Sequence, residues 1–322
     1  MLYAGTTPNF CFKHSIYSDK VTELKLRSQS AGLKFLSFFL IKIKKGINGS
    51  SETLSNKSKD SENIKKISIH VPKHLKPVSD LEFANYLAGL IDGDGHFSKA
   101  FQLVIAFNEL DASLAYFIKE KIGYGNVYRV KNKKALILVI SKRKGLLKIL
   151  NLINGKIRSE NKLTQINKNI LSNPYFKLMS NFTINPDLDL NNYWLAGFSD
   201  ADASFQIKLI TRNNKTEVRL NFQIDQKKKD LLFLIKNFVG GNIGFRKSQD
   251  TYYFNSTSFG AAKKVIKYFD QFNLLSSKYI NYLKWRKAYI IIQNKDHLNE
   301  KGLKKIVRLK KTMNRNNSEN MD

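Results

Sequence analysis

The chain carries one short motif twice. The first copy reads Leu-Ala-Gly-Leu-Ile-Asp-Gly-Asp-Gly over residues 87–95, and the second reads Leu-Ala-Gly-Phe-Ser-Asp-Ala-Asp-Ala over residues 195–203. Each copy is a stretch of apolar and small residues that runs into an Asp-x-Asp, and Asp94 and Asp202 hold the same place in the two copies. A repeat that supplies one carboxylate per copy predicts two similar sites that face each other across a pseudo-twofold axis.

The residues around the first copy predict a mixed helix and strand unit. Ser79 and Glu82 form a capping-box pattern, which predicts a helix from Asp80 to about Ile91. Gly93 and Gly95 are expected to help end this helix. A hairpin, a helix, a second hairpin and a further helix follow, as judged from apolar periodicity.

The second half repeats this order, with a longer polar turn in its first hairpin. A helix is predicted from Pro186 to near Ser199, with Asp187 as its N-cap. The predicted fold class is therefore α+β, with two pseudo-symmetric αββαββα domains. The predicted boundaries are an N-terminal extension and flexible linker at 1–78, a first domain at 79–172, an interdomain linker at 173–185, a second domain at 186–312 and a C-terminal tail at 313–322.

The charge of the chain restricts its partners. Its 322 residues include 55 Lys and Arg against 26 Asp and Glu, a formal net charge of +29. Such an excess repels itself unless a polyanion neutralises it, which favours nucleic acid first and an anionic membrane surface second. The longest apolar stretch, Leu33 to Ile43, is interrupted by lysines and is too short to span a bilayer, so no membrane is expected. The single cysteine, Cys11, excludes a disulfide framework.

Alternation in two strands of the second half predicts a polar sheet surface. Apolar residues such as Phe205 and Ile207 point one way, and polar residues alternate with them. Amide and cationic side chains suit base edges and phosphates, so we expect nucleic-acid binding rather than an ordinary solvated face. The candidate DNA contacts are Gln206, Lys208, Arg219, Asn221 and Gln223.

The small residues of the motif predict close helix packing and a metal site. Side chains as small as those of Ala88-Gly89 and Ala196-Gly197 let two helices approach closely, which brings Asp94 and Asp202 together. Two neighbouring carboxylates repel unless a cation lies beside them. Mg²⁺ or Mn²⁺ prefers such oxygen ligands, and phosphodiester hydrolysis by metal-activated water is the natural reaction. The other reading, helix caps, suits Asp92 and Asp200.

The two segments resemble the signature helices of the LAGLIDADG homing endonucleases, in the form with both copies on one chain. The resemblance covers about residues 79–312 and implies a monomer whose two antiparallel sheets form a saddle over double-stranded DNA. It implies that Asp94 and Asp202 bind the divalent metal, with Gly93 and Ala201 beside them in the metal site. It also implies a basic catalytic residue near each site. The matching lysines are Lys278 in the second half and Lys162 in the first, with Lys156 as the alternative to Lys162.

Two departures and a rival function accompany this resemblance. The second motif has Ala203 where the first has Gly95, and Ser199 where an aliphatic residue is usual, so strain is expected in that half-site. Members of the family act in intron homing, and others are maturases that assist the splicing of group I intron RNA. The abundance of residues with AT-rich codons, Lys, Asn, Ile, Phe and Tyr, is typical of an organelle genome and favours a mitochondrial protein.

Overall fold

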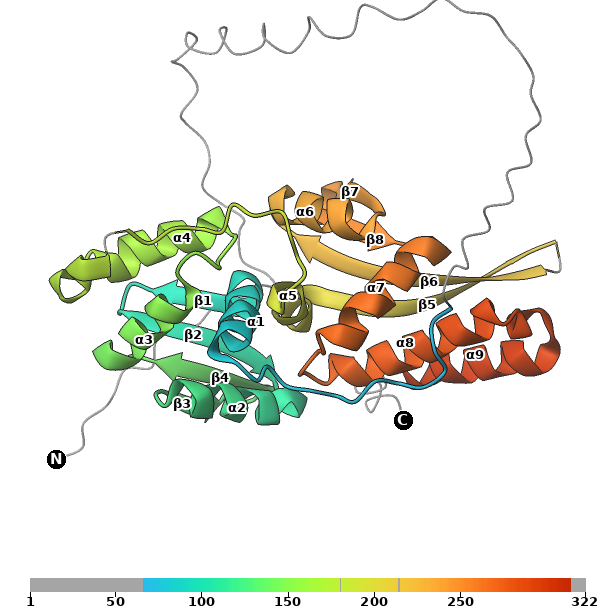
Figure 1. The fold of residues 1–322 in the computed structure, drawn as a ribbon, viewed down its shortest axis with the longest axis horizontal. Coiled ribbons are helices and arrows are strands. Elements are labelled where there is room, and N and C mark those ends of the chain that lie inside the picture. Colours follow the sequence, from blue (N-terminus) through green and yellow to red (C-terminus); the bar gives the residue numbers. More distant parts are fainter. Residues whose placement is uncertain (1–65, 180, 214, 314–322) are drawn as a thin grey trace, which may run out of the picture. The chain divides into compact units, whose positions relative to one another are not determined.

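Two four-stranded antiparallel sheets flank a central pair of helices in the computed structural model, which describes residues 66–179, 181–213 and 215–313 (Figure 1). The first sheet has the strand order β1-β2-β4-β3 and the second the order β5-β6-β8-β7. The equal order follows from the repeat in the sequence, and each sheet is covered on one face by the helices of its own half.

The first half begins with the helix of the first motif. Its elements are α1 (Asp80–Asp94), β1 (Gly95–Ser98), β2 (Gln102–Asn108), α2 (Ala112–Ile122), β3 (Asn126–Arg129), β4 (Ala135–Ile140), α3 (Arg143–Ile153), and α4 (Glu160–Ile166), which runs into the π-helical η2 (Asn167–Leu171).

The second half repeats the order with a longer first hairpin and one further helix, α9. Its elements are α5 (Trp194–Asp202), β5 (Ala203–Arg212), β6 (Lys215–Gln226), α6 (Asp230–Val239), β7 (Asn242–Arg246), β8 (Thr251–Ser256), α7 (Phe259–Gln271), α8 (Lys278–Gln293) and α9 (Glu300–Thr312). The predicted αββαββα order is confirmed in both halves, and α4 and α8 follow it.

The core of the second half lies between its sheet and its helices. Phe205, Phe222 and Phe254 alternate toward the helices and are almost fully buried. The ring of Phe205 lies 5.6 Å from that of Trp285 on α8, so α8 packs directly on the inner face of the sheet. The polar residues between these phenylalanines therefore point to the outer face, by which we mean the sheet face turned away from the helices.

The helix α1 extends past its predicted end. It was expected to stop near Ile91, but it continues to Asp94, and Gly95 is its C-cap with extended backbone (φ −72°, ψ 148°). Gly93 lies inside the helix, so its predicted role as a terminator is wrong. Its small size serves packing instead, because a Cβ atom there would lie 2.3 Å from the Cβ of Ala201.

The prediction that a helix starts at Pro186 is also wrong, since α5 begins at Trp194. The preceding segment is irregular because its Asx side chains accept the N–H groups two residues ahead, which competes with helix formation. Asp187 accepts the backbone N–H of Asp189 at 3.0 Å and does not cap a helix. The guanidinium of Arg158 also holds this segment by donating to the carbonyl groups of Asp187 and Asp189.

Residues 67–76 run along α8 before the first half begins (Figure 1). Gln293 exchanges two hydrogen bonds with the backbone of Ile67, and Arg286 donates to the carbonyls of Ser68 and His70 at 3.1 Å. Farther along, the ring of His74 contacts the Leu274 carbonyl at 2.8 Å. This strap thus ties the start of the described chain to its second half.

Some predictions lie outside the described residues. These are Cys11, the stretch from Leu33 to Ile43, most of the predicted flexible linker and nearly all of the C-terminal tail. Among the helices of the described ranges, none combines the length and the apolar character needed to cross a membrane.

Candidate functional site

The helices α1 and α5 touch through their backbones. A Cβ atom at Gly89 would lie 1.9 Å from the carbonyl oxygen of Trp194, and one at Gly197 would lie 2.0 Å from that of Tyr86. Ala88 and Ala196 are fully buried beside them. The structure thus brings the predicted interface residues together, and any larger side chain at either glycine would force the helices apart.

The first aspartate of motif one links the two halves. The Oδ2 atom of Asp92 accepts the indole N–H of Trp194 and the backbone N–H of Arg158, both at 2.8 Å. Its Oδ1 atom accepts the N–H of Ser159 at 3.2 Å. Trp194 belongs to the opposite helix, so Asp92 holds α5 against α1 while it fixes the loop before α4.

Asp200 repeats this arrangement in the second motif. Its carboxylate accepts the hydroxyl of Tyr86 on α1 at 2.7 Å and the N–H groups of Leu275 and Ser276 at 2.7 and 3.2 Å. Tyr86 and Trp194 occupy equivalent places six residues before their own aspartates. Asp92 and Asp200 are therefore structural aspartates, but neither caps its own helix, because their donors come from the opposite motif helix and from the loops before α4 and α8.

Burial acts on the ionisation of both structural aspartates. Desolvation raises the pKa of Asp92 to about 6, although its three N–H donors and Lys162 favour the charged form. Burial likewise raises the pKa of Asp200, against the hydrogen bonds from Ser276, Leu275 and Tyr86. Loss of either carboxylate would leave several buried donors without acceptors, which is costly.

Asp94 and Asp202 end the two helices on the same side of the interface. Asp94 is exposed and Asp202 is half-buried, so both are accessible to solvent. A Cβ atom at Gly93 would lie 3.1 Å from Oδ2 of Asp202, which places the end of α1 against the carboxylate of α5. The C-terminal ends of helices also carry partial negative charge. The structure thus gathers Asp94, Asp202, Gly93 and Ala201 into one electronegative centre.

Lys278 and Lys162 lie beside this centre, but in different ways. The Nζ atom of Lys278 donates to the carbonyl oxygens of Ala201 and Ser199 at 2.7 and 3.2 Å. The Nζ atom of Lys162 donates to the carbonyl oxygen of Gly95 at 2.5 Å, and the side chain of Lys162 is buried. Lys156, the alternative to Lys162, donates instead to Asn154 at 3.4 Å.

Burial lowers the pKa of Lys278 below its ordinary value. The carboxylates of Asp200, Asp94 and Asp202 act in the opposite direction and favour the ammonium form. Lys278 thus responds electrostatically to the aspartates of both motifs, so it lies within the combined centre and not in one half alone.

Gln226 is a site residue that the sequence interpretation missed. Its Nε2 atom donates to Oδ2 of Asp202 at 2.5 Å. Strand register makes Phe107 its equivalent in the first half, because Ile224 pairs with Ala203 as Ile105 pairs with Gly95. The available signal was an amide at the inward-facing end of an otherwise apolar strand face, next to a run of lysines.

The donor set at Asp94 and Asp202 fits a hard divalent cation. Two carboxylates lie at the ends of two helices whose carbonyl oxygens point the same way, and both are open to solvent. No group of three or more His, Cys, Asp or Glu side chains that could hold a metal occurs among the described residues. Such a cation would therefore keep water and substrate oxygens as its other ligands, as Mg²⁺ commonly does.

Three of the predicted DNA contacts, Gln206, Asn221 and Gln223, form one connected polar network on the outer face of the second sheet. Asn221 donates to Gln206 at 3.1 Å and to Gln223 at 3.2 Å, and Gln223 donates to Asp225. Asn221 is fully buried within this network, whereas Lys208 is exposed. Arg219, paired across the strands with Lys208, makes a bidentate ion pair with Glu217 at 2.7 and 2.9 Å.

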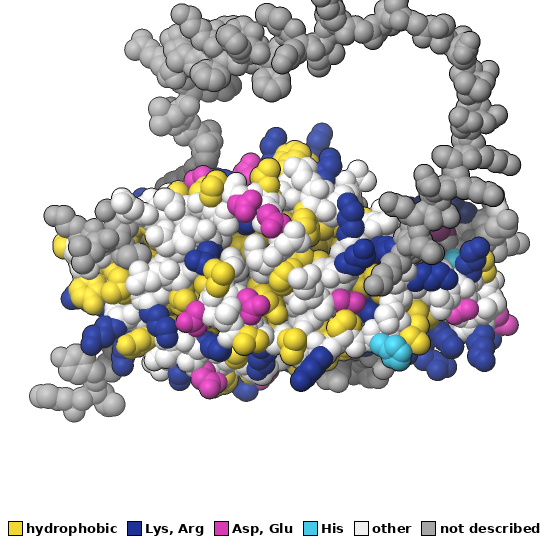
Figure 2. Space-filling model, in the orientation of Figure 1, with side chains coloured by type: hydrophobic (Ala, Val, Ile, Leu, Met, Phe, Trp, Pro, Cys, Tyr) yellow, Lys and Arg dark blue, Asp and Glu magenta, His cyan; other side chains and the backbone are white. Residues whose placement is uncertain are grey.

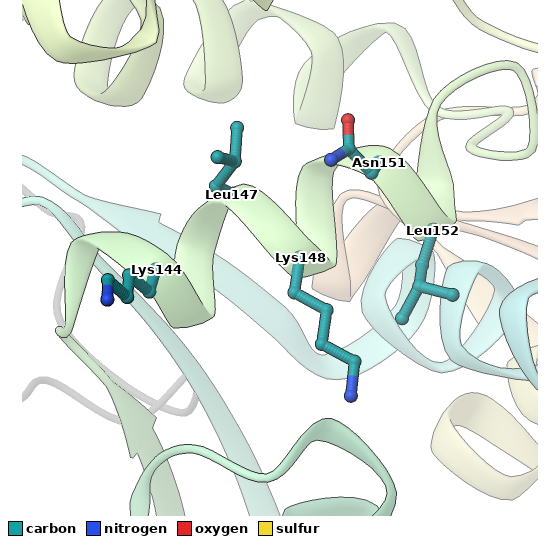
Figure 3. A pocket seen from close by; sticks show the side chains of 5 residues that line it. All are labelled: Lys144, Leu147, Lys148, Asn151 and Leu152. Atoms are coloured by element: carbon teal, nitrogen blue, oxygen red, sulfur yellow. The ribbon is translucent and has the colours of Figure 1, made fainter.

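A depression on α3 lies apart from this network. Figure 3 shows that all its lining side chains come from this one helix and that they point in different directions. It therefore offers no converging polar groups for a small ligand. Its lining residues are Lys144, Leu147, Lys148, Asn151 and Leu152.

Comparison with known proteins identifies the family to which this fold belongs. A family model described as LAGLIDADG endonuclease matches residues 195–289. The cox1 intron-2 37.2 kDa protein of Schizosaccharomyces pombe, of uncharacterized activity, is 54% identical over 95% of this chain and 94% of its own length. The chain belongs to the LAGLIDADG endonuclease family.

Two further relatives of this LAGLIDADG protein are named for different activities. The intron-encoded DNA endonuclease aI3 of Saccharomyces cerevisiae is 29% identical over 65% of this chain and 63% of its own length. The intron-encoded RNA maturase bI4 of the same organism is 32% identical over 54% of this chain and 27% of its own length. Family membership alone therefore does not decide between a DNA endonuclease and an RNA maturase, and the geometry of the site has to be considered.

Solved LAGLIDADG structures share the fold. The meganuclease I-CpaMI, bound to uncleaved DNA, has a TM-score of 0.57 at 20% identity and covers 72% of this chain and 99% of its own. I-SmaMI, bound to an uncleaved DNA target in the presence of calcium ions, has a TM-score of 0.53 at 23% identity and covers 75% and 99%. The predicted fold class, a saddle of two pseudo-symmetric domains, is confirmed.

The two departures from the LAGLIDADG pattern lie next to each other. A Cβ atom at Gly95 would lie 2.7 Å from the Cα atom, 2.8 Å from Cγ2 and 2.9 Å from the carbonyl oxygen of Ile91, so the first motif needs glycine there. In the second motif Ser199 replaces Ile91 and Ala203 replaces Gly95. Ser199 lacks the Cγ2 methyl group and so removes the side-chain contact. Ala203 has ordinary extended backbone that differs slightly from that of Gly95 (φ −87°, ψ 156° against φ −72°, ψ 148°).

Proposed function

We propose that this chain is a site-specific endonuclease that hydrolyses both strands of duplex DNA and acts in the homing of its intron, in mitochondria. The observation that carries the proposal is the pairing of Asp94 and Asp202 at the ends of two helices that meet at backbone contact, between two similar sheets. Two equivalent carboxylates in one chain fit two equivalent phosphodiesters on opposite strands, so the active species is a monomer.

In this proposal each aspartate serves one scissile phosphate. A divalent cation held by Asp94 and Asp202, with Mg²⁺ or Mn²⁺ as the expected ion, supplies water activation and neutralises phosphate charge. Asp92 and Asp200 hold the helices in register through Trp194 and Tyr86. Small errors in this register would misplace the reacting groups, which is costly for catalysis.

The lysines have an electrostatic role in this proposal. Lys278 already donates to the carbonyl oxygen of Ala201, so its ammonium group stands beside Asp202. A cation there stabilises the negative charge that grows on the phosphate during hydrolysis. Lys162 is buried against Gly95 and has the equivalent role near Asp94.

The first test concerns the metal-binding carboxylates. Asp94→Asn and Asp202→Asn should each abolish or greatly slow double-strand cutting of the intronless host allele in Mg²⁺, because the amide is a poor ligand for the cation. Binding to the same duplex should stay near wild type, as measured by gel shift in Ca²⁺. Asp80→Asn, at the exposed start of α1, is the control and should cut normally. Undiminished cutting by either motif variant removes that aspartate from the proposed role.

A stripe of exposed basic side chains on α9, on the helix layer and not on the sheets, is the observation that favours the rival function, an RNA maturase. Lys301, Lys304, Arg308 and Lys311 are exposed and lie opposite the side of the helix that is buried through Ile306. Glu300 is the acidic residue of this helix and pairs with Lys304 at 2.5 Å. Since α9 packs on α8, this stripe lies on the helix layer, where Figure 2 shows dark-blue side chains gathered.

Neutralising this stripe separates the two functions. We expect the variant with Lys301, Arg308 and Lys311 all changed to Gln to lose affinity for the structured intron RNA if the chain acts as a maturase, while DNA cutting stays unchanged. Tight, specific RNA binding combined with weak, sequence-independent DNA binding by the wild-type protein would contradict the endonuclease proposal.

A further inference from the structure

The outer faces of the two sheets differ in chemistry although their strands are equivalent. In the second sheet one row across the strands reads Ser204, Gln223, Asn255 and Asn242. The equivalent row in the first sheet reads His96, Val104, Val139 and Asn126. Both rows begin directly after the motif helix, so hydrogen-bonding amides in one half stand where valines stand in the other.

The next row shows the same exchange. In the second sheet Asp225 pairs with Tyr253, and Asp225 accepts a hydrogen bond from Arg246 at 2.7 Å. In the first sheet Ala106 and Ile137 occupy these two positions. Ala106, Ile137 and Val139 are half-exposed on the outer face, so they are available for contact.

Polar groups surround this apolar centre. His96 and Asn126 lie at the ends of its first row, and Tyr128, which is 51% exposed, lies next to Ile137 and accepts a hydrogen bond from Asn126. The aliphatic side chains thus lie inside a rim of hydrogen-bonding groups, whereas obligate protein interfaces are larger and more uniformly apolar.

We infer that the two halves read their half-sites by different chemistry, the first sheet through thymine methyl groups and the second through hydrogen bonds to base edges. The inference rests on the proposed endonuclease function. In the major groove the thymine C5-methyl is the one apolar feature, and aliphatic side chains contact it, whereas Asn and Gln pair with adenine N6 and N7. Val139, Ile137 and Ala106 therefore select a thymine-rich half-site, and Gln223 and Asn255 select by donors and acceptors.

Hydrogen bonds among the side chains on the outer face of the second sheet support the inference that this sheet reads base edges. The amides of Asn221 and Gln223 already hold each other in one orientation, and Asp225 holds Gln223 at 3.1 Å. Preorganised donors and acceptors discriminate strongly, because a wrong base leaves a buried polar group unpaired. An aliphatic side chain of the first sheet leaves no polar group unpaired when it meets a wrong base. It therefore discriminates less strongly between bases at each base pair.

The test removes one methyl group at a time from the DNA. The duplex is the sequence that the full chain cuts most efficiently in a randomised library, and each thymine is replaced in turn by uracil. We expect uracil to weaken binding about fourfold per contacted methyl in one half-site, as the burial of one methylene-sized group implies, and to have little effect in the other. Replacing adenine by 7-deazaadenine, which lacks the N7 acceptor, should give the reverse pattern.

Variants assign each half-site to its sheet. Val139→Ser removes both side-chain methyl groups and should abolish the uracil effect at its own position only, whereas Gln223→Ala should abolish a 7-deazaadenine effect in the other half. Thermal melting of both variants checks that they fold. Uracil effects that persist in both Val139→Ser and Ile137→Ser overturn the inference. Uracil effects that disappear in Gln223→Ala overturn it as well, and neither result touches the cutting of DNA.

Two other outcomes are also decisive. A wild-type chain that dimerises in solution, and becomes a monomer in Val139→Ser, would assign the apolar face to contact with a second copy and overturn the inference. Absence of any sequence-specific cutting or binding of duplex DNA would instead contradict the proposed function itself.

Discussion

At the scale of single residues, the two aspartates of each motif have opposite environments. Asp92 is buried and accepts three N–H groups, whereas Asp94, two residues later, is exposed at the end of the helix. In the second motif Asp200 is likewise buried, whereas Asp202 is half-buried. One aspartate of each pair therefore builds the interface, and the other remains available for a ligand.

The ionisation of Asp92 predicts a pH dependence of stability. Its pKa is raised by burial to about 6 from 3.8, so the folded state binds the proton more tightly than the unfolded state. Its contribution to the free energy of unfolding should fall as pH rises from about 4 to 6, by about 3 kcal/mol at most, and stay constant above that range. Urea unfolding of wild type and Asp92→Asn should show a stability gap that narrows over this interval. A gap that widens would mean that the N–H donors outweigh burial.

Gln226 predicts unequal cutting of the two strands. Its amide holds Asp202, whereas Phe107 stands at the equivalent place near Asp94. Gln226→Ala should slow cleavage of one strand by about 10–100-fold, as loss of a group that orients a metal ligand commonly does. End-labelled strands measure the two rates separately. Equal slowing of both strands would show that Gln226 acts on folding or binding and not on one site.

At the scale of elements, α1 and α5 depend on glycine at their crossing. The same contact could not form with alanine, since a Cβ atom at Gly89 or Gly197 would lie about 2 Å from a backbone oxygen. The strap along α8 adds a second connection between the halves. There the buried Arg286 pairs with Asp270 at 2.9 Å and still donates to the carbonyl groups of the strap.

Enlarging a crossing glycine should separate the halves. Gly89→Leu or Gly197→Leu should lower the free energy of unfolding by about 1–3 kcal/mol or more through overpacking, and should lower cleavage further than stability. Gly260→Leu is the matched control, because Gly260 is exposed in α7 and a Cβ atom there meets nothing within 4 Å. Melting temperature and cutting rate are the measurements. Wild-type values for Gly89→Leu would contradict the close contact.

At the scale of the whole molecule, the positive charge of the chain bears on how the saddle would bind DNA. The chain carries a net charge of +29, and among the described residues the outer face of the second sheet presents the exposed Lys208. A duplex held mainly through phosphates releases counterions on binding, so its affinity falls steeply with salt.

The salt dependence of DNA binding should report the phosphate contacts. The slope of log K against log salt should be about −0.9 per phosphate contacted, and Lys208→Ala should flatten it by about one unit. Arg219→Ala should flatten it less, because Glu217 already neutralises that guanidinium. Lys267→Ala, on the exposed side of α7, is the control and should leave the slope unchanged. Equal effects of Lys208→Ala and Lys267→Ala would place the duplex elsewhere.

The repeat in the sequence was enough to predict the architecture. Two copies of a motif that combines small residues with an Asp-x-Asp predict a helix pair with one carboxylate per copy, because glycine spacing and periodicity are local properties. Strand alternation likewise predicted the polar face that carries Gln206 and Lys208. The helix start at Pro186 failed because Asx turns and the guanidinium of Arg158 outweigh the cap signal there.

Only the tertiary structure decided which residues act across the interface. The contacts of Trp194 with Asp92 and of Tyr86 with Asp200 join residues more than a hundred positions apart, and no local pattern marks them. Gln226 reaches Asp202 only because β6 pairs with β5 in one register. The apolar outer face of the first sheet was equally hidden, since valines in a strand are ordinary until register places them opposite the amides of the other half. Sequence determines the elements and their polarity, whereas register and helix crossing determine which side chains meet.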